Sequence, residues 1–515
     1  MPGAGNRAGH LFMSFESDLQ KAIEVEAEKL ISRFHRYHNR LERAHQMEKK
    51  RVRDVAPKVI KEPPYWTTDR KFNPFYVSSH SKAIARSMIG KIRNGTYKPF
   101  PPVTRSIPKP MGGQRTVTVF QIPDAALSNV LYRELLAKNK HRFSGFSYAY
   151  RDDRNAHFAV QDIAVDLRYY SRLFVCEVDF SDFFGSINHE YLYEQFSKNG
   201  FFISDTEAKL IRAFLSHQKN GRGLPQGSSI SLFLANLACW EMDKALEREG
   251  TKFARYADDT IIWTSDYARI CKAFEIVNDF ASASGISINF KKSDGISLLA
   301  QQGLKSEIYR FKHHVDFLGY KIGVDSVGIK EKAILKIKRR ISFIIYRNLI
   351  QPLVPVKLRA VTIPANGKDE GFLAAVMQVR RYLYGNLSER QLYRYFKGYT
   401  RRLQFKGLMS FYPLLDNEKQ LKELDGWLLA TFDRALKRRA ALLAAKNFDR
   451  SNEFPFNVHG KELLERCARE RIFGKRLLRL PSFLRVYRVI KKGLAAKGIE
   501  ATMNPRTRRY PSDSR

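Results

Sequence analysis

The sequence predicts an α/β fold followed by an all-helical and strongly basic region. Between about residues 105 and 325, short β-type runs alternate with helical segments, which is the pattern of α/β proteins. After Gly328 the apolar residues recur at helical spacing, with lysine and arginine interleaved among them. The 515 residues carry 90 Lys+Arg against 52 Asp+Glu, a formal net charge of +38. A polyanion, either a nucleic acid or an anionic membrane surface, is therefore the first partner to consider.

The sequence argues against a membrane protein and against a metal- or disulfide-stabilised one. No apolar run reaches the roughly 18–20 residues that a spanning helix needs, and the first residues lack the apolar core of a signal peptide. The four cysteines are far apart and form no C-x-x-C pair, which disfavours a zinc site and a disulfide framework. We therefore expect a cytoplasmic nucleic-acid protein with no membrane partner.

The N-terminal region, residues 1–64, is predicted to be a helical extension. Apolar residues recur at helical spacing over residues 14–55, and the prolines at 57, 63 and 64 end this helix. We favour a brace packed on the body of the protein over an arm that binds RNA directly. A second helix is expected over residues 81–94, closed by Gly95.

Three segments of the α/β region carry candidate chemistry. Residues 173–180 form a β-rich run that delivers Asp179 near its end, and residues 253–263 form two β-type runs around a tight turn that carries Asp258 and Asp259. Adjacent acids between apolar strands are unfavourable unless a cation lies there. Mg²⁺ prefers such oxygen ligands, and two ions about 4 Å apart can drive an in-line displacement at phosphorus. The third segment, residues 223–229, is a glycine-bounded loop leading into a helix.

These segments resemble the A, C and B motifs of reverse transcriptases, in which Tyr256-Ala257-Asp258-Asp259 matches the Y-x-D-D signature and Leu224-Pro225-Gln226-Gly227 matches the motif B loop. Residues 107–115 look like the fingers hairpin, 285–293 like motif D, and 317–320 like the motif E primer grip. The resemblance covers roughly residues 105–325. It implies a right-hand polymerase of α/β class, with fingers, palm and thumb, and an added all-α basic C-terminal domain.

The resemblance also implies domain boundaries and site roles. The expected parts are the N-terminal extension, fingers and palm over 65–328, a helical thumb and connector over 329–450, and a basic helical region with a tail over 451–515. Two Mg²⁺ ions are expected, with Asp179 and Asp258 as ligands, Asp259 as a third carboxylate, and the Phe180 carbonyl as an extra ligand. The primer grip would comprise Phe317, Leu318 and Gly319.

Five further residues are expected at the nucleotide. Lys109 and Arg115 would hold the triphosphate, since an ammonium and a forked guanidinium suit that task. The ring of Phe184 would exclude a ribose 2′-hydroxyl, Gln226 would line the pocket, and Lys292 would protonate the leaving pyrophosphate. The alternatives are solvated hairpin charges for Lys109 and Arg115, a core phenylalanine for Phe184, and a surface lysine for Lys292.

The class of reverse transcriptase is narrowed by what the sequence lacks. No zinc-binding endonuclease module and no RNase H carboxylate cluster is apparent. Asn155-Ala156-His157 superficially resembles a retron motif but precedes Asp179, so we interpret it as an ordinary helix start. The chain is most similar to the bacterial defence-associated ("unknown group") reverse transcriptases, and more distantly to group II intron and retron enzymes. That resemblance implies antiphage defence, a dedicated noncoding RNA and, in some cases, homo-oligomers.

The expected function is an RNA-directed DNA polymerase that makes cDNA from dNTPs on an RNA template. The alternatives are a maturase-like RNA-binding or splicing factor and a template-independent DNA polymerase on the same fold. A further hypothesis is that the phenol of Tyr510, in a basic tail, acts as a protein primer. In the helical region Tyr393, Tyr395, Tyr399 and Phe405 could stack bases, although we favour a core role. For residues 471–515, which hold thirteen Lys/Arg and two acids, we favour nucleic-acid contact.

Overall fold

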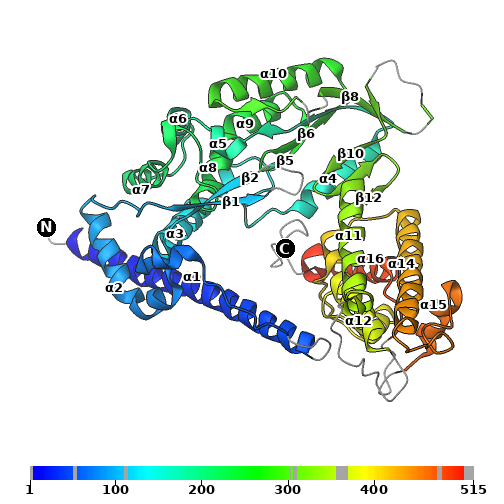
Figure 1. The fold of residues 1–515 in the computed structure, drawn as a ribbon. Coiled ribbons are helices and arrows are strands. Elements are labelled where there is room, and N and C mark those ends of the chain that lie inside the picture. Colours follow the sequence, from blue (N-terminus) through cyan, green and yellow to red (C-terminus); the bar gives the residue numbers. More distant parts are fainter. Residues whose placement is uncertain are drawn as a thin grey trace. The chain divides into compact units, whose positions relative to one another are not determined.

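The computed structural model describes residues 4–49, 55–108, 114–290, 293, 295–301, 303–304, 310–354, 369–471 and 478–503. The chain forms two compact units (Figure 1). The first comprises Met1–Arg43, Lys58–Ala159 and Tyr170–His313, and the second comprises Ala44–Pro57, Val160–Tyr169 and His314–Arg515. The four-part division expected from the sequence stays a prediction. Lys109, Lys292 and Tyr510 lie outside the described residues.

The first unit begins with α1 (Ala4–Lys49) and α2 (Pro74–Arg93). Leu19, Ile23 and Ala27 of α1 are fully buried in the core of this unit, which confirms the predicted brace for this part of the helix. Helix α2 begins at Pro74, seven residues before the predicted start. The reason is local, because the Asn73 side chain caps the helix and proline is well suited to its first position.

Two antiparallel strands, β1 (Val103–Pro108) and β2 (Gln114–Val119), lie in the segment that resembles the fingers hairpin, and Ile107 is paired to Arg115. The helices α3 (Ile122–Asn139) and α4 (Ala156–Tyr169) follow, and from Val160 onward α4 belongs to the second unit. The side chain of Asn155 accepts hydrogen bonds from the backbone N–H groups of residues 157 and 158. Asn155 is thus an N-cap, so the interpretation of this segment as a helix start is confirmed.

The centre of the first unit is a five-stranded sheet of order β5-β6-β3-β8-β9. Its neighbours are antiparallel except for β8 and β9, which are parallel. Helix α10 packs on β3 and β6 (Figure 1). The strands are β3 (Arg172–Val178), β5 (Lys252–Tyr256), β6 (Asp259–Thr264), β8 (Gly295–Ala300) and β9 (Phe311–Lys312). A separate pair comprises β4 (Phe180–Ser181) and β7 (Ser287–Ile288).

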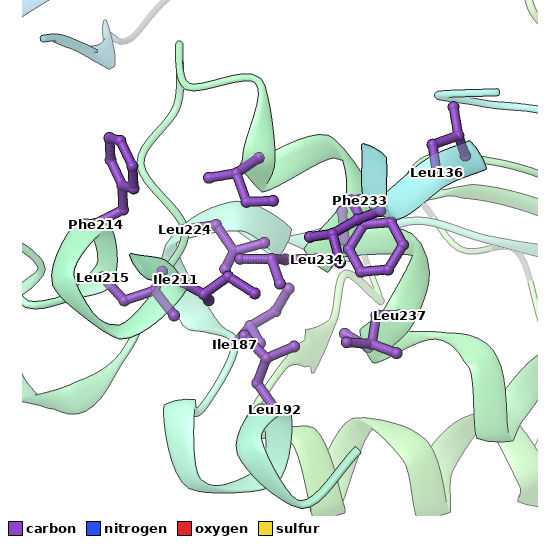
Figure 2. Packing of buried hydrophobic residues seen from close by; sticks show 14 of the residues in the cluster. Leu136, Ile187, Leu192, Ile211, Phe214, Leu215, Leu224, Phe233, Leu234 and Leu237 are labelled. Atoms are coloured by element: carbon purple, nitrogen blue, oxygen red, sulfur yellow. The ribbon is translucent and has the colours of Figure 1, made fainter. Parts of the chain in front are cut away.

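The helices of the first unit bury an apolar core beside this sheet. Figure 2 shows Leu224, from the loop that resembles motif B, packed among side chains such as Ile187, Ile211 and Leu234. Because this leucine is 2% exposed, the loop is fixed to the core at one point. The remaining helices are α5 (Phe183–Ser186), α6 (His189–Lys198), α7 (Asp205–Leu215), α8 (Ile230–Ala238), α9 (Trp240–Arg248) and α10 (Tyr267–Ser284).

The second unit joins a small antiparallel sheet to a set of helices. The apolar residues of α11 (Glu331–Leu349), which recur at helical spacing, are largely buried, whereas Leu335 is exposed. None of the helices in the described part of the chain has the length and apolar character that a membrane span requires. The elements are β10 (His314–Phe317), β11 (Tyr320–Gly323), β12 (Val327–Ile329), α11 (Glu331–Leu349), α12 (Glu370–Tyr384), α13 (Glu389–Phe396), α14 (Glu418–Ala444), α15 (Gly460–Arg469) and α16 (Phe483–Thr502).

Buried ion pairs hold the helices of the second unit together. The Asp369 carboxylate caps α12 at Phe372 and lies 2.8 Å from the guanidinium of Arg439 on α14. Arg439 also donates to the backbone carbonyl of Leu349 at the end of α11. A single buried arginine therefore links three helices.

We expect Arg439→Met to lower the free energy of unfolding by about 3–5 kcal/mol, because it leaves the buried Asp369 carboxylate without its partner. Arg438→Met, on the exposed face of the same helix, is the matched control and should change stability by less than about 0.5 kcal/mol. Urea or thermal unfolding followed by circular dichroism measures both. Equal effects for the two variants would contradict the proposed role of Arg439.

Candidate active site

The three candidate carboxylates lie at one edge of the central sheet. Asp179 directly follows the end of β3, and Asp259 is the first residue of β6. In the register of these antiparallel strands the last pair is Val178 and Thr260. Asp179 directly follows Val178 and Asp259 directly precedes Thr260, so both acids lie just beyond this pair at the same edge of the sheet. Asp258 lies in the turn between β5 and β6, and all three acids are half-buried. Acids that are distant along the chain therefore lie at the same edge of the sheet.

Asp179 is held in place by the segment that resembles motif D. The Asn289 side-chain amide donates to the Asp179 carboxylate at 3.0 Å, and the Asn289 backbone N–H donates to the Asp179 carbonyl at 2.8 Å. The Asp179 backbone N–H in turn donates to the Ser293 hydroxyl at 3.0 Å. These contacts orient one candidate ligand before any substrate is bound. The sequence indicated the segment but not these two positioning residues.

The hairpin that carries Asp258 rests on a buried ion pair. Arg255 of β5 is fully buried, and its guanidinium donates to both carboxylate oxygens of Asp243 at 2.8 and 2.6 Å. It also donates to the Ala257 carbonyl at 3.2 Å, immediately before Asp258. Burial alone would lower the pKa of Arg255, but the Asp243 carboxylate outweighs it and holds that pKa above its ordinary value. The arginine therefore remains charged beneath the turn.

The loop resembling motif B approaches strand β2 very closely. The Thr118 backbone N–H donates to the Gln226 carbonyl at 2.7 Å. Gly227 has φ = +119°, and a Cβ atom there would lie 2.5 Å from the Thr118 carbonyl oxygen. Only glycine satisfies both the backbone conformation and this contact. The half-buried Gln226 is thereby fixed through its backbone.

Phe184 is half-buried and connects this loop to the carboxylate edge. Its backbone carbonyl accepts a hydrogen bond from the Leu224 N–H at 2.5 Å. At the next residue, Gly185, a Cβ atom would lie 2.1 Å from the Asp182 carboxylate, so a larger residue there would require the exposed Asp182 side chain to shift. The ring of Phe184 packs edge-on against Tyr150, with centroids 6.3 Å apart. Phe184 is thus partly accessible, unlike its fully packed neighbour Phe183.

Tyr150 is a further candidate site residue, which sequence reasoning missed. It has φ = +59°, a conformation that costs an ordinary residue free energy and that is common at functional sites. Burial raises the pKa of its phenol, and the Asp258 carboxylate raises it further, while Arg115 opposes the shift. Tyr150 therefore lies within electrostatic range of one candidate ligand and one candidate triphosphate contact. No motif in the sequence signalled this, because a tyrosine in an irregular segment has no periodicity to follow.

The other predicted site residues lie in several different elements of the structure. Arg115 is exposed on β2, and Phe180 buries its ring in the core while its backbone pairs with β7. Phe317, Leu318 and Gly319 form a hairpin in the second unit, where the Phe317 ring is buried. Lys109 and Lys292 lie outside the described residues, so their roles stay predictions.

The donor set favours an oxygen-seeking cation. Among the described residues no three His, Cys, Asp or Glu side chains form a ready-made metal cluster. Mg²⁺ does not need one, since it commonly binds one or two carboxylates together with substrate phosphates. Thiolate ligation is disfavoured, because burial raises the pKa of both Cys176 and Cys239 to about 12. The carboxylates at this edge fit a hard divalent ion that a substrate helps to hold.

Comparisons with known proteins agree with this geometry. Residues 107–322 match the family model described as "Reverse transcriptase (RNA-dependent DNA polymerase)". The chain is 23% identical over 402 residues to the COX1/OXI3 intron 1 protein of Saccharomyces cerevisiae, covering 65% of this chain and 45% of that protein. It is 29% identical over 127 residues to the Retron Ec86 reverse transcriptase of Escherichia coli, covering 23% and 37%. The chain thus spans less than half the length of these curated relatives.

Solved structures of telomerases also align with the chain. The apo telomerase of Candida tropicalis is 13% identical, with 75% of this chain and 72% of that chain covered and a TM-score of 0.36. A telomerase of Candida albicans is 12% identical, with 72% and 66% covered and a TM-score of 0.34. The family match confirms the predicted fold class, a right-hand polymerase core, and the described residues from 331 onward form the predicted helical region.

We expect Gly227→Ala to lower the free energy of unfolding about 1–3 kcal/mol more than Gly221→Ala, because only the first substitution drives a Cβ atom into the backbone. Gly221 is a matched control, since it also has positive φ but a Cβ atom there would meet no other atom within 4 Å. Thermal unfolding of both variants measures the clash together with the higher conformational cost of φ = +119° at Gly227 compared with φ = +61° at Gly221. Equal losses would mean that the loop moves away without penalty.

Proposed function

We propose that this chain, which carries a reverse transcriptase domain over residues 107–322, is an RNA-directed DNA polymerase that extends a primer 3′-end with dNTPs on an RNA template. The observation that carries the proposal is the meeting of Asp179, Asp258 and Asp259 at one edge of the sheet. Nucleotidyl transfer needs carboxylates at such a position, and it needs them held rigidly. Asn289 and Arg255 supply that rigidity here.

In this proposal Asp179 and Asp258 hold two Mg²⁺ ions, with Asp259 and the Phe180 carbonyl as further ligands. When bound, such ions activate the primer 3′-hydroxyl and stabilise the leaving pyrophosphate. The chain's own residues do the rest. Asn289 keeps the Asp179 carboxylate in one orientation, and Arg115 offers a forked guanidinium for the triphosphate. Lys109 would assist Arg115, and Lys292 would protonate the pyrophosphate.

Phe184 would select deoxynucleotides by occupying the space of a ribose 2′-hydroxyl, and Gln226 would line the same pocket. Two features support this role. The backbone of Phe184 is fixed by the Leu224 N–H, and its ring is braced from the side by Tyr150. A selective side chain must resist displacement by the larger substrate, because otherwise the steric penalty disappears. Tyr150 would therefore act as a positioning residue for selectivity.

We further propose that the enzyme acts in the cytoplasm of a bacterium, in antiphage defence, with a dedicated noncoding RNA as template and with assembly into homo-oligomers. The support is the resemblance of this polymerase core, with its separate helical C-terminal region, to defence-associated reverse transcriptases. Co-purification and sequencing of bound RNA tests the template. Phage challenge of cells that carry the active or inactive chain tests the biological role.

A second candidate is an RNA-binding splicing factor on the same fold. One observation favours it, because the match to the yeast intron 1 protein covers 65% of the chain and so extends beyond the reverse transcriptase domain. The two candidate functions predict different effects of removing the carboxylates. A polymerase would lose its activity, whereas a splicing factor would keep its activity. A template-independent polymerase would instead keep synthesis after its bound RNA is digested.

We expect Asp258→Asn combined with Asp259→Asn to reduce labelled dNTP incorporation by about 100-fold or more, while the amount of co-purified RNA is unchanged. The reason is that amides are poor ligands for Mg²⁺ whereas the fold is retained. Asp279→Asn, an exposed acid on α10, is the matched control and should be fully active. Loss of incorporation in the control, or full incorporation by the double variant, would contradict the assignment of the site.

We expect Tyr150→Ala to raise ribonucleotide incorporation relative to deoxynucleotide incorporation by about two- to tenfold, which corresponds to the free energy of one aromatic pair. Tyr150→Phe should retain selectivity, because it keeps the edge contact with Phe184 and removes only the hydroxyl. Single-turnover incorporation of dNTP and NTP on the same primer–template measures the ratio. If Tyr150→Phe loses as much selectivity as Tyr150→Ala, the hydroxyl of Tyr150 rather than its ring is responsible for the selectivity.

A further inference from the structure

The segment that follows α12 contains both buried and solvent-exposed aromatic side chains. Tyr395 and Phe405 are 6% and 1% exposed and belong to the core of the second unit. Tyr393, Phe396 and Tyr399 are 53%, 44% and 68% exposed. The core role favoured for these aromatics is therefore correct for Tyr395 and Phe405 and wrong for Tyr393 and Tyr399. Three large aromatic side chains within seven residues of chain face solvent.

The same segment is exceptionally rich in positive charge. Residues 390–406 contain no Asp or Glu, and all of their lysines and arginines are exposed. The acid adjacent in the sequence, Glu389, is buried and pairs with Arg485, so it does not neutralise this surface. We call the following residues the α13 surface: the aromatic residues Tyr393, Phe396 and Tyr399, and the cations Arg390, Arg394, Lys397, Arg401, Arg402 and Lys406.

The helical spacing explains why these residues share a side. Positions 390, 393, 394 and 397 recur at the three- and four-residue spacing of one helix face, whereas Leu392 and Tyr395 face inward. The Ser388 side chain and Gln391 form a capping box that fixes the start of α13. The surface is thus presented by an ordered helix and the turn after it.

Helix α16 holds the other side of the segment and adds charge. The Lys492 ammonium donates to the Phe396 carbonyl at 2.5 Å and lies 5.5 Å from the centroid of the Phe396 ring. Lys497 donates to the Arg401 carbonyl. These contacts fix the backbone of the segment at two points. Aromatic side chains on a fixed backbone lose little conformational freedom when a ligand stacks on them.

We propose that the α13 surface is a binding site for single-stranded nucleic acid, separate from the reverse transcriptase domain. Exposed rings offer stacking platforms for unpaired bases, and the surrounding cations follow a phosphate backbone. A duplex fits this surface less well, because its bases are already stacked on one another. An acidic protein would be attracted by the cations but would leave the three rings without matching partners.

This site would retain a single strand of RNA or DNA at residues 390–406; under the proposed polymerase activity that strand would be template RNA or newly made DNA. The inference goes beyond the proposed polymerase activity and does not require it, because stacking and phosphate contacts need no catalysis. RNA and DNA share the chemistry in question. Oligonucleotides of each sugar type therefore form two arms of the test, and preference for RNA would indicate contacts to the 2′-hydroxyl.

The experiment uses the full chain and photoreactive oligonucleotides of twelve nucleotides, 5-bromouridine RNA and 5-bromodeoxyuridine DNA, with crosslinks mapped by mass spectrometry. The test variant combines Tyr393→Leu, Phe396→Leu and Tyr399→Leu, which keeps apolar bulk but removes stacking. The matched control is Tyr346→Leu on α11, a tyrosine of the same unit that is 46% exposed. Thermal unfolding confirms that each variant is folded.

We expect crosslinks at residues 390–406 in the unmodified chain and in the control, and their loss in the triple variant. Affinity should fall about tenfold or more, since each stacked base is worth a substantial fraction of the binding. Replacing Arg394, Arg401 and Arg402 by Gln should reduce the slope of log affinity against log salt concentration by about two, because each phosphate contact to a single strand contributes roughly 0.7 to that slope.

Crosslinks that are absent from this segment, or that persist unchanged in the triple variant, would overturn the proposal. Such a result leaves the polymerase proposal intact if the chain still extends a primer. Conversely, crosslinks at the α13 surface in a chain that fails to incorporate any nucleotide would support this site and reject the polymerase. The two proposals therefore fail separately.

Discussion

The candidate active site depends on one buried contact, the bidentate pair between Arg255 and Asp243. The guanidinium lies under the β5–β6 turn and donates to the carbonyl of Ala257, so it fixes the backbone next to Asp258. It also donates to the Ser147 hydroxyl, three residues before Tyr150. A fully buried charge is costly unless every donor is satisfied, and here five hydrogen bonds offset that cost. One arginine thus connects the candidate metal-binding edge to the segment that carries Tyr150, the residue proposed to position Phe184.

The sequence predicted the acids but not the residues that hold them, and the reason is physical. Asp179 and Asp258 lie at strand ends, where period-two runs and a tight turn mark the position. Asn289, Arg255 and Tyr150 act through contacts between segments far apart in the chain. No local pattern encodes such contacts, so they become visible only when the strands are paired. The start of α2 was missed for the opposite reason, because Asn73 and Pro74 are local signals that the apolar pattern outweighed.

The aromatic segment of the second unit marks another limit of sequence reasoning. A pattern of alternating aromatic and basic residues is compatible with aromatic side chains packed in the core and with aromatic side chains exposed on a nucleic-acid-binding surface. The two cases differ only in the direction in which each side chain points. Tyr395 and Tyr399 differ by one helical turn, yet the first is buried and the second exposed, because α13 ends between them at Phe396. The position of the helix end therefore determines which tyrosine is buried, and the ends of helices are the feature least reliably predicted from sequence.

Two hairpins, one in each unit, place an ordinary residue where glycine is preferred. Ala257 has φ = +64° before Asp258, and Leu318 has φ = +48° before Gly319 in the predicted primer grip. Such a conformation costs about 1–2 kcal/mol and persists only where the surroundings impose it. Arg255 imposes it on the first hairpin, and the hydrogen bond from the Lys330 N–H to the Gly319 carbonyl does so for the second. Both turns are thus rigid at the residues that would position primer and metal, which is the property that nucleotidyl transfer requires.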